Sequence, residues 1–334
     1  MTGLIDVHHH FIPEIYREAL AAVGIRSSGG KAIARWMPED SLGLMDRLGI
    51  EKAYGSISEP AVYPLVAADP AGAAALCRRV NEAMAEMKET YPGRFGAFAL
   101  LPMPDAARSV EELRYALDVL HLDGAGLLSN YRDHFLGDMV FDGLMKELDE
   151  RAAVVYVHPG VPLPGTARPQ FVYADFMQEF CFNTARAAAN LMMSGTMERA
   201  PRIRFVFSHM GGVLPYLRWR LSTVFPYTPE LRQMYGAPET VCRGWEQVKQ
   251  NLRVYMSRMW FDTALATDPM VYRLVEDTAP GHIVFGTDSF FAPEILDHLM
   301  LRQLKDMLPE EEFRRTARTN AEALFARSPE EALR

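Results

Sequence analysis

Four short apolar segments of the chain end in side chains that can bind a metal ion or move a proton. Three consecutive histidines, His8 to His10, lie near the start, and His158, His209 and Asp288 end three later segments. Neutral imidazole and carboxylate are donors that zinc, manganese and iron accept in mixed nitrogen and oxygen sites. An ion with an open coordination position could activate water or polarise a bound substrate. These residue types therefore indicate metal-assisted chemistry.

The spacing of the first histidines fits an extended strand. His8 and His10 are two residues apart, so both side chains are expected on one face of a strand, with His9 turned toward the surrounding helices. Each residue alone also has a plainer interpretation: a hydrogen-bonded structural histidine, a turn or cap aspartate, or the remnant of a purification tag. The joint occurrence of such residues at four strand ends favours a metal site.

The elements that must position these residues follow a regular alternation of short apolar runs and helical patterns. Eight runs are expected to be strands: 4–8, 53–57, 95–101, 124–128, 154–158, 205–209, 260–263 and 283–287. Between them, helical spacing covers 41–48, 71–91, 109–120, 141–151, 175–199, 269–278 and 294–306. Strands alternating with helices predict a parallel sheet, and eight strands can close into a barrel. The carboxyl ends of all strands then meet at one rim, where the polar residues would converge.

The prediction is thus a single (β/α)8 TIM-like barrel domain over residues 1–334, with long loops after strands 1 and 6. The long connections are 11–39 and 214–256. Long connections in compact enzymes are usually functional. We expect the second of them to close over the site.

Composition excludes several other classes of function. Apolar residues make up 49% and charged residues 23% of the chain, as in globular proteins. A net charge of −8 argues against nucleic acid as a partner. The chain has only three widely spaced cysteines, no signal-peptide pattern and no long apolar stretch. A cytoplasmic protein without disulfides or a membrane span is expected.

Six short segments together resemble one branch of the amidohydrolase superfamily. They are 5–13 (IDVHHHFIP), 128–131 (LSNY), 155–159 (VYVHP), 208–212 (SHMGG), 261–264 (FDTA) and 285–288 (FGTD). This branch contains aminocarboxymuconate-semialdehyde, γ-resorcylate and 6-methylsalicylate decarboxylases. The segments occur in the family order and extend over almost the whole chain.

The resemblance implies a role for each matching residue. His8, His10, His158 and Asp288 correspond to metal ligands, and Asp288 also to a proton-transfer partner. His209 corresponds to a catalytic residue that acts on protons or a bound water, with direct metal contact as the less favoured alternative. Residues 124–130 lack the bridging lysine of binuclear relatives, so one divalent ion is implied, zinc by preference with manganese permitted, and no organic cofactor.

The resemblance also implies non-oxidative decarboxylation of an aromatic or unsaturated carboxylic acid, either salicylate-like or carboxymuconate-like. Asn130, Tyr131, Phe290 and Phe291 are the predicted substrate contacts, and a homodimer or homotetramer is expected. The main alternative is a metal-dependent hydrolase of a lactone or amide, which needs almost the same residues. A catalytically inactive barrel that serves as a binding module would instead be expected to have broken metal ligands.

Overall fold

Eight parallel strands form one sheet whose neighbours follow the order of the chain. The computed structural model describes residues 3–227, 230 and 236–326. The strands are β1 (Leu4–His10), β4 (Ile50–Ser56), β5 (Phe95–Leu100), β6 (Gly124–Leu128), β9 (Val154–His158), β10 (Arg204–Phe207), β11 (Trp260–Asp262) and β12 (Ile283–Val284). All eight predicted strands are confirmed, with boundaries that differ by up to three residues.

Backbone hydrogen bonds join the last strand to the first and close the sheet. The N–H of Val7 donates to the carbonyl of Phe285 at 2.9 Å, and the N–H of Asp288 donates to the carbonyl of His8 at 2.9 Å. His9 and Ser289 form a further parallel bridge between the two segments. The predicted (β/α)8 barrel is therefore confirmed.

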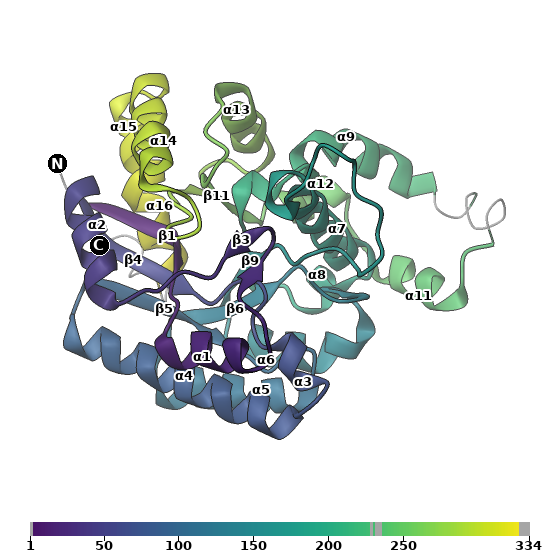
Figure 1. Ribbon diagram of the computed structural model, residues 1–334. Helices are drawn as coiled ribbons and strands as arrows, with labels where there is room; N and C mark the ends of the chain where they lie inside the picture. The colour runs from purple at the N-terminus through teal and green to yellow at the C-terminus, as the bar shows by residue number, and fades with distance from the viewer. Residues whose placement is uncertain (1–2, 228–229, 231–235, 327–334) are drawn as a thin grey trace.

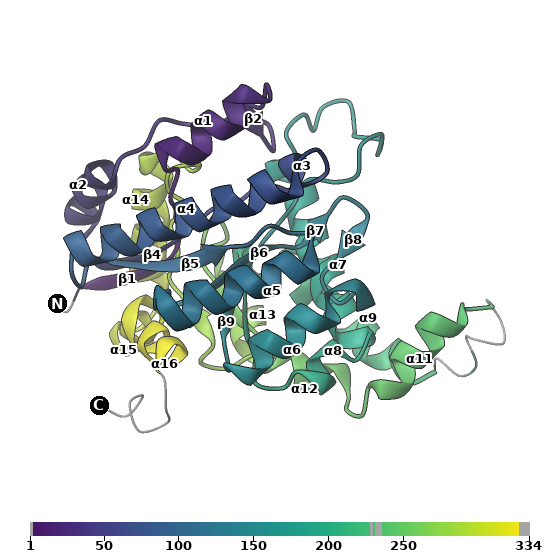
Figure 2. The same ribbon diagram turned by 90° about the horizontal axis from the view of Figure 1, so that it is seen from below.

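Helices surround the strands on the outside of the barrel. They are α1 (Glu14–Ala22), α2 (Pro38–Leu48), α3 (Tyr63–Val66), α4 (Pro70–Thr90), α5 (Ala106–Arg114), α6 (Asp142–Glu150), α7 (Glu179–Met193), α8 (Thr196–Arg199), α9 (Leu214–Val224), α11 (Glu239–Gln247), α12 (Leu252–Met256), α13 (Pro269–Thr278), α14 (Glu294–Met307), α15 (Glu310–Arg314) and α16 (Asn320–Phe325). Figure 1 shows α4 and α5 along one side of β4, β5 and β6, and Figure 2 shows the same layer from below. Aspartates cap several of these helices; the Asp69 carboxylate, for example, accepts a hydrogen bond from the N–H of Gly72 at the start of α4.

Two buried clusters of apolar side chains stabilise the barrel. The larger one lies between the strands and the helices, where the nearly continuous apolar strands are covered. The smaller one collects strand side chains such as Val7, Phe98 and Tyr156 together with Leu324 of α16. Alternate strand residues fill the inside of such a barrel, so its interior is a packed core and not a pore.

The two long connections contain more regular structure than predicted. Between β1 and β4 lie α1, α2 and a small hairpin of β2 (Ser27–Ser28) and β3 (Lys31–Ala32). Between β10 and β11 lie α9, α11 and α12, and α11 projects from the body in both views (Figures 1 and 2). Within the described residues, no helix combines the length and the hydropathy that crossing a bilayer requires.

Candidate metal centre and substrate cavity

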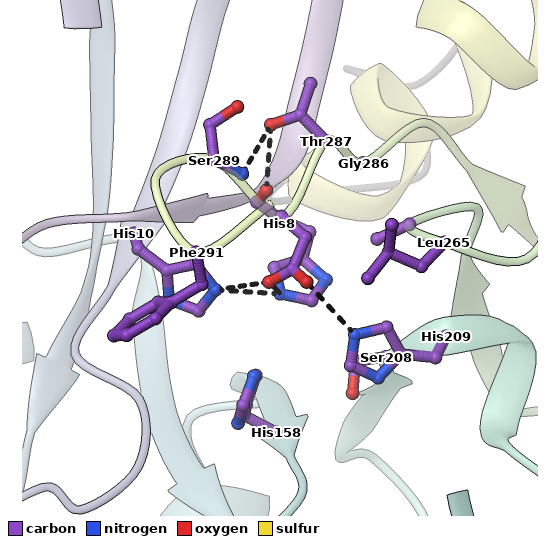
Figure 3. A network of polar contacts seen from close by, with 12 residues as sticks. His8, His10, His158, Ser208, His209, Leu265, Gly286, Thr287, Ser289 and Phe291 are labelled. Atoms are coloured by element: carbon purple, nitrogen blue, oxygen red, sulfur yellow. Dashed lines mark hydrogen bonds and ion pairs between the residues drawn. The ribbon is translucent and has the colours of Figure 1, made fainter. Parts of the chain in front are cut away.

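Five side chains from four strand ends converge at the carboxyl rim of the barrel. His8 and His10 belong to β1, His158 ends β9, His209 follows β10, and Asp288 follows β12. Figure 3 shows the four imidazole rings facing a common point. One ligand atom from each of His8, His158, His209 and Asp288 can be chosen so that all four lie within 4.8 Å of one another. This group does not include His10, but His10 Nε2 lies 2.7 Å from Asp288 Oδ1, so all five predicted residues lie close together.

The shortest contacts have the spacing of ligands around a single ion. Asp288 Oδ1 lies 3.1 Å from His8 Nε2 and 2.7 Å from His10 Nε2, and the two imidazole nitrogens lie 3.2 Å apart. Ligand atoms about 2.0–2.2 Å from an ion, at angles near 90–110°, are about 3–3.5 Å from each other, which the 3.1 and 3.2 Å distances match, whereas 2.7 Å is a hydrogen-bond distance between His10 and Asp288. These three residues therefore fit a divalent ion.

The orientation of His158 is compatible with the same ion. Its Nδ1 lies 2.9 Å from the carbonyl oxygen of Pro159, to which it can donate a proton. Nε2 then keeps its lone pair, which is the form that binds metals. His10 differs, because its buried Nδ1 has no hydrogen-bond partner in the described structure.

The charge distribution of the site favours a bound cation. Burial alone would lower the pKa of His8, but the carboxylates of Asp262 and Asp288 outweigh burial and raise it to about 10. Burial lowers the pKa of His10 to about 4 and lowers that of His158 well below its usual value. The rings of His10 and His158 are thus neutral and could bind a metal ion, while His8 lies between two carboxylates that attract positive charge. A divalent ion supplies that charge in place of a proton.

Asp262, at the end of β11, orients both His8 and the turn that carries His209. Its Oδ2 accepts hydrogen bonds from His8 Nδ1 at 3.0 Å and from the Tyr156 hydroxyl at 2.9 Å. Its Oδ1 accepts from the backbone N–H of His209 at 3.0 Å. A carboxylate on the far nitrogen of a ligating histidine fixes the tautomer that binds metal. Sequence reasoning assigned Asp262 no role, although its position as an acid at a strand end was the available signal.

His9 points away from the centre, as its spacing predicted. Its Nδ1 lies 2.9 Å from Asp6 Oδ2, and its Nε2 lies 2.8 Å from the hydroxyl of Ser41 on α2. Asp6 also accepts from the hydroxyl of Thr287 at 2.7 Å, next to Asp288. This buried network ties the histidine strand to the segment after β12.

His209 lies on a sharply turned backbone. Both His209 and Met210 have positive φ, at 55° and 54°, which is uncommon for residues other than glycine. His209 Nε2 is 3.7 Å from Asp288 Oδ2, the carboxylate oxygen that does not contact His10. The turn therefore aims the ring at the second oxygen of the shared carboxylate.

A cavity of about 470 Å³ opens directly beside these residues. Its walls include His158, His209 and Asp288 and are otherwise mainly apolar. The remaining lining residues are Ser28, Gly29, Lys31, Ser58, Glu59, Phe176, Met177, Phe180, Cys181, Leu265, Phe291, Ala292, Pro293 and Leu296. Apolar pockets with a few convergent polar groups are typical of small-molecule sites.

Of the four predicted substrate contacts, one lines this cavity. Phe291 is part of the wall, and its ring centroid lies 4.8 Å from that of His10. Phe290 packs edge-on against His9, away from the lining. Asn130 donates to the carbonyl of Val161 at 2.9 Å, and the hydroxyl of Tyr131 accepts from a backbone N–H at 2.9 Å. Asn130 therefore links the segment after β6 to the one after β9, Tyr131 bonds within its own turn, and neither side chain lines the cavity.

The cover of the cavity comes from the hairpin β2–β3 and from the segment that leads into α7. Ser28, Gly29 and Lys31 lie on the hairpin, and 176–181 contribute further lining residues. Among the described residues of 214–256, which we expected to close over the site, none lines the cavity.

Glu59 is a second functional candidate that sequence reasoning missed. It lies shortly after β4, is 5% exposed, and lines the cavity. Burial raises the pKa of its carboxyl to about 7. The available signal was the acid in Ser58-Glu59-Pro60, at the carboxyl end of a barrel strand.

The sequence and the fold of this chain are similar to those of known amidohydrolases and decarboxylases. A family model described as amidohydrolase matches residues 5–327. A 6-methylsalicylic acid decarboxylase from Aspergillus aculeatus is 36% identical over 297 residues, which are 86% of this chain and 84% of that protein. The structure of a 2,6-dihydroxybenzoate decarboxylase from Rhizobium superposes with a TM-score of 0.78 at 25% identity, covering 97% of this chain and 99% of that one.

A second solved structure shares the fold at lower identity. It is a dihydroxybenzoic acid decarboxylase from Polaromonas, solved with bound manganese and the inhibitor 2-nitroresorcinol. It superposes with a TM-score of 0.75 at 23% identity and covers 97% of both chains.

Proposed function

The chain belongs to the amidohydrolase family, and from this premise we propose that it is a metal-dependent decarboxylase of an aromatic carboxylic acid. One observation carries the proposal: four residues could together hold a metal ion, and three of them, His158, His209 and Asp288, line an apolar cavity large enough for a substituted ring. Relatives named for the decarboxylation of 6-methylsalicylic acid and 2,6-dihydroxybenzoate support the same reaction.

His8, His10, His158 and Asp288 would hold one divalent ion. When bound, the ion would act as a Lewis acid toward the substrate carboxylate. We propose zinc or manganese, because three imidazoles suit zinc and the added carboxylate permits manganese. Manganese is the metal in the Polaromonas structure.

The reaction exchanges a carboxylate for a proton on one ring carbon. The ring carbon takes up a proton, the bond to the carboxyl carbon breaks, and CO2 leaves. We assign the handling of the proton to Asp288 and His209, whose Oδ2 and Nε2 atoms are 3.7 Å apart at the cavity wall. A side chain within hydrogen-bond reach of the reacting carbon, directly or through one water, can serve in this way.

The apolar wall would position the ring and limit access of water. Phe291 follows Asp288 by three residues and carries its ring from the metal site into the cavity. Excluding water strengthens the electrostatic interactions inside a site. We retain Phe291 as a proposed substrate contact; Asn130, Tyr131 and Phe290 would act indirectly by supporting the loops around it.

A panel assay tests the proposed reaction. Metal-loaded protein is incubated with hydroxybenzoates, methylsalicylates and unsaturated dicarboxylates, and CO2 release is measured. We expect release from at least one hydroxylated benzoate, and its loss in the His158→Ala and Asp288→Asn variants. Turnover of lactones or amides without any CO2 release would favour the hydrolase instead.

A homo-oligomer in the cytoplasm stays a prediction from the sequence.

A further inference from the structure

A carboxylic acid that the metal site does not use faces the same cavity. Glu59 is 5% exposed, and it lines the cavity together with Ser28 and Ser58. Most of the other lining residues, apart from the metal-site residues and Lys31, are apolar or aromatic. The two serines and Glu59 therefore form a polar region in an otherwise apolar wall.

The partners of Glu59 leave part of its carboxyl group without a strong hydrogen bond. Oε1 accepts hydrogen bonds from the Ser28 hydroxyl at 3.2 Å and the Tyr63 hydroxyl at 3.1 Å. Oε2 has only the backbone N–H of Val161, at a long 3.4 Å. A carboxylate offers about four acceptor positions, so Oε2 retains acceptor capacity, and the residue that carries it lines the cavity.

The contacts of Glu59 include no positively charged side chain among the described residues. Its hydrogen-bond partners there are the hydroxyls of Ser28 and Tyr63 and the backbone N–H of Val161. Lys31, the lysine that lines the cavity, donates its Nζ hydrogen bond to the carbonyl oxygen of Phe291. Burying an unpaired carboxylate is costly, and burial accordingly raises the pKa of Glu59 to about 7. Near neutral pH the group can therefore be either a hydrogen-bond donor or an acceptor.

We propose that Glu59 is a specificity-determining residue that hydrogen-bonds a hydroxyl group on the substrate ring, apart from the group bound at the metal. The inference rests on the proposed decarboxylase function and narrows its substrate class to dihydroxylated benzoic acids. A ring hydroxyl can accept from the neutral acid or donate to the carboxylate. A methyl group at the same place can do neither and would leave a buried polar group unpaired. The chain should therefore prefer an acid with a second ring hydroxyl over 6-methylsalicylate, although the relative named for that acid is 36% identical.

The test compares kcat/KM for matched substrates. The panel contains the 2,3-, 2,4-, 2,5- and 2,6-dihydroxybenzoates, salicylate and 6-methylsalicylate. We expect wild-type protein to prefer one dihydroxybenzoate over salicylate and 6-methylsalicylate by about 10- to 100-fold, as for a site that hydrogen-bonds a substrate hydroxyl. In the Glu59→Met variant, the ratio of kcat/KM for that dihydroxybenzoate to kcat/KM for salicylate or 6-methylsalicylate should fall to about 1. In the Glu59→Gln variant, whose amide both donates and accepts, most of the ratio should remain.

The ratio separates specificity from a structural role. If Glu59 only anchored the hairpin through Ser28, the Glu59→Met variant would lose activity on all substrates in parallel and the ratio would not change. Tyr63→Phe is the matched control, since it removes one partner of Glu59 without removing a group that lines the cavity. Its ratio should stay close to that of wild type. An unchanged ratio in Glu59→Met, or a wild-type preference for 6-methylsalicylate, would overturn the inference.

Measuring the binding of ring compounds that lack a carboxylate tests the role of Glu59 independently of any decarboxylase activity. Calorimetry on metal-loaded protein measures affinity for resorcinol and catechol against phenol and m-cresol. If wild-type protein releases no CO2 from any acid, the decarboxylase proposal fails, and a preference for dihydroxylated ligands that disappears in Glu59→Met still supports the role of Glu59. If the preference for dihydroxylated ligands over phenol and m-cresol is the same in wild type and in Glu59→Met, or is absent from wild type, that role is overturned.

Discussion

The Asp262→Asn substitution removes one negative charge from behind the metal centre with almost no change in side-chain size. In the wild type, Asp262 Oδ2 accepts from His8 Nδ1 at 3.0 Å, while Oδ1 accepts from the backbone N–H of His209 at 3.0 Å. An asparagine that keeps its oxygen toward His209 turns its amide hydrogens toward His8. His8 Nδ1 must then act as the acceptor, which moves the ring proton to Nε2. That is the atom that faces Asp288 at 3.1 Å.

The expected magnitude follows from this change of tautomer. Loss of an outer partner of a ligating histidine typically weakens metal binding by about 10- to 100-fold. That range corresponds to about 1.4–2.7 kcal/mol of binding free energy. We expect the loss of metal affinity in Asp262→Asn to lie near the upper end of this range, because the substitution removes the charge and also reverses the hydrogen bond with His8 Nδ1. Tyr156→Phe is the matched control: it removes a neutral donor to the same carboxylate at 2.9 Å and should weaken binding by less than about 10-fold.

The assay is competition with a chromophoric chelator at fixed pH, performed with both Zn²⁺ and Mn²⁺. Circular dichroism of the metal-free proteins confirms that each variant is folded. A dissociation constant for Asp262→Asn within about twofold of wild type would refute the reasoning. Equal losses in Asp262→Asn and Tyr156→Phe would refute it as well, because packing and not charge would then explain both.

Three further predictions concern the metal, the cavity and the backbone beside them. Metal uptake at pH 7.5 should release about one proton, because the raised pKa of His8, about 10, keeps it protonated in the metal-free protein. The affinity of the protein for the metal ion should therefore rise with pH up to about 10. Calorimetry of metal binding in two buffers with different ionisation enthalpies measures the proton release, and finding none would contradict the prediction. Phe291→Leu should raise KM about 10-fold without changing metal content, as measured by steady-state kinetics and metal analysis. Gly286→Ala should lower the free energy of unfolding by about 1–3 kcal/mol in denaturant titrations, since its Cβ would lie 2.6 Å from His8 Cβ; an unchanged midpoint would argue against this close contact.

The barrel and its metal cluster could be predicted from the sequence because both depend on local patterns. Strand-length apolar runs alternate with helical spacing, and parallel topology then brings every strand end to one rim. His8, His158 and Asp288 are far apart in sequence, yet the topology alone predicts that they meet. No detail of side-chain packing was needed for that step.

The cavity could not be predicted in the same way, because its walls depend on how the connections fold back over the rim. Residues 11–39 read as a loop, yet they contain a hairpin whose Ser28 and Lys31 line the cavity. Asn130 and Tyr131 follow β6 as expected, but Asn130 hydrogen-bonds the carbonyl of Val161 in the connection after β9, and the Tyr131 hydroxyl accepts from the N–H of Leu128 at the end of β6. Backbone direction after a strand end is set by these tertiary contacts and not by local propensity.

Asp262 shows a different limit of the sequence. An acid at a strand end can be a metal ligand, a helix cap or a support for a ligand, and these roles need the same residue type. Only the 3.0 Å contact with His8 Nδ1 assigns it to the third role. Glu59 is similar, because its burial in the cavity wall depends on the hairpin that covers it.

The most direct test of the proposed reaction follows both the carboxyl carbon that leaves the ring and the hydrogen that replaces it. Metal-loaded protein is incubated in D2O with salicylate, 6-methylsalicylate and dihydroxybenzoates that carry ¹³C in the carboxyl group, and the products are analysed by mass spectrometry and NMR. We predict labelled CO2 and one deuterium on the ring carbon that lost the carboxylate, with both signals absent in Asp288→Asn. Metal-loaded wild-type protein that leaves the label in the ring acid across the whole panel would contradict it.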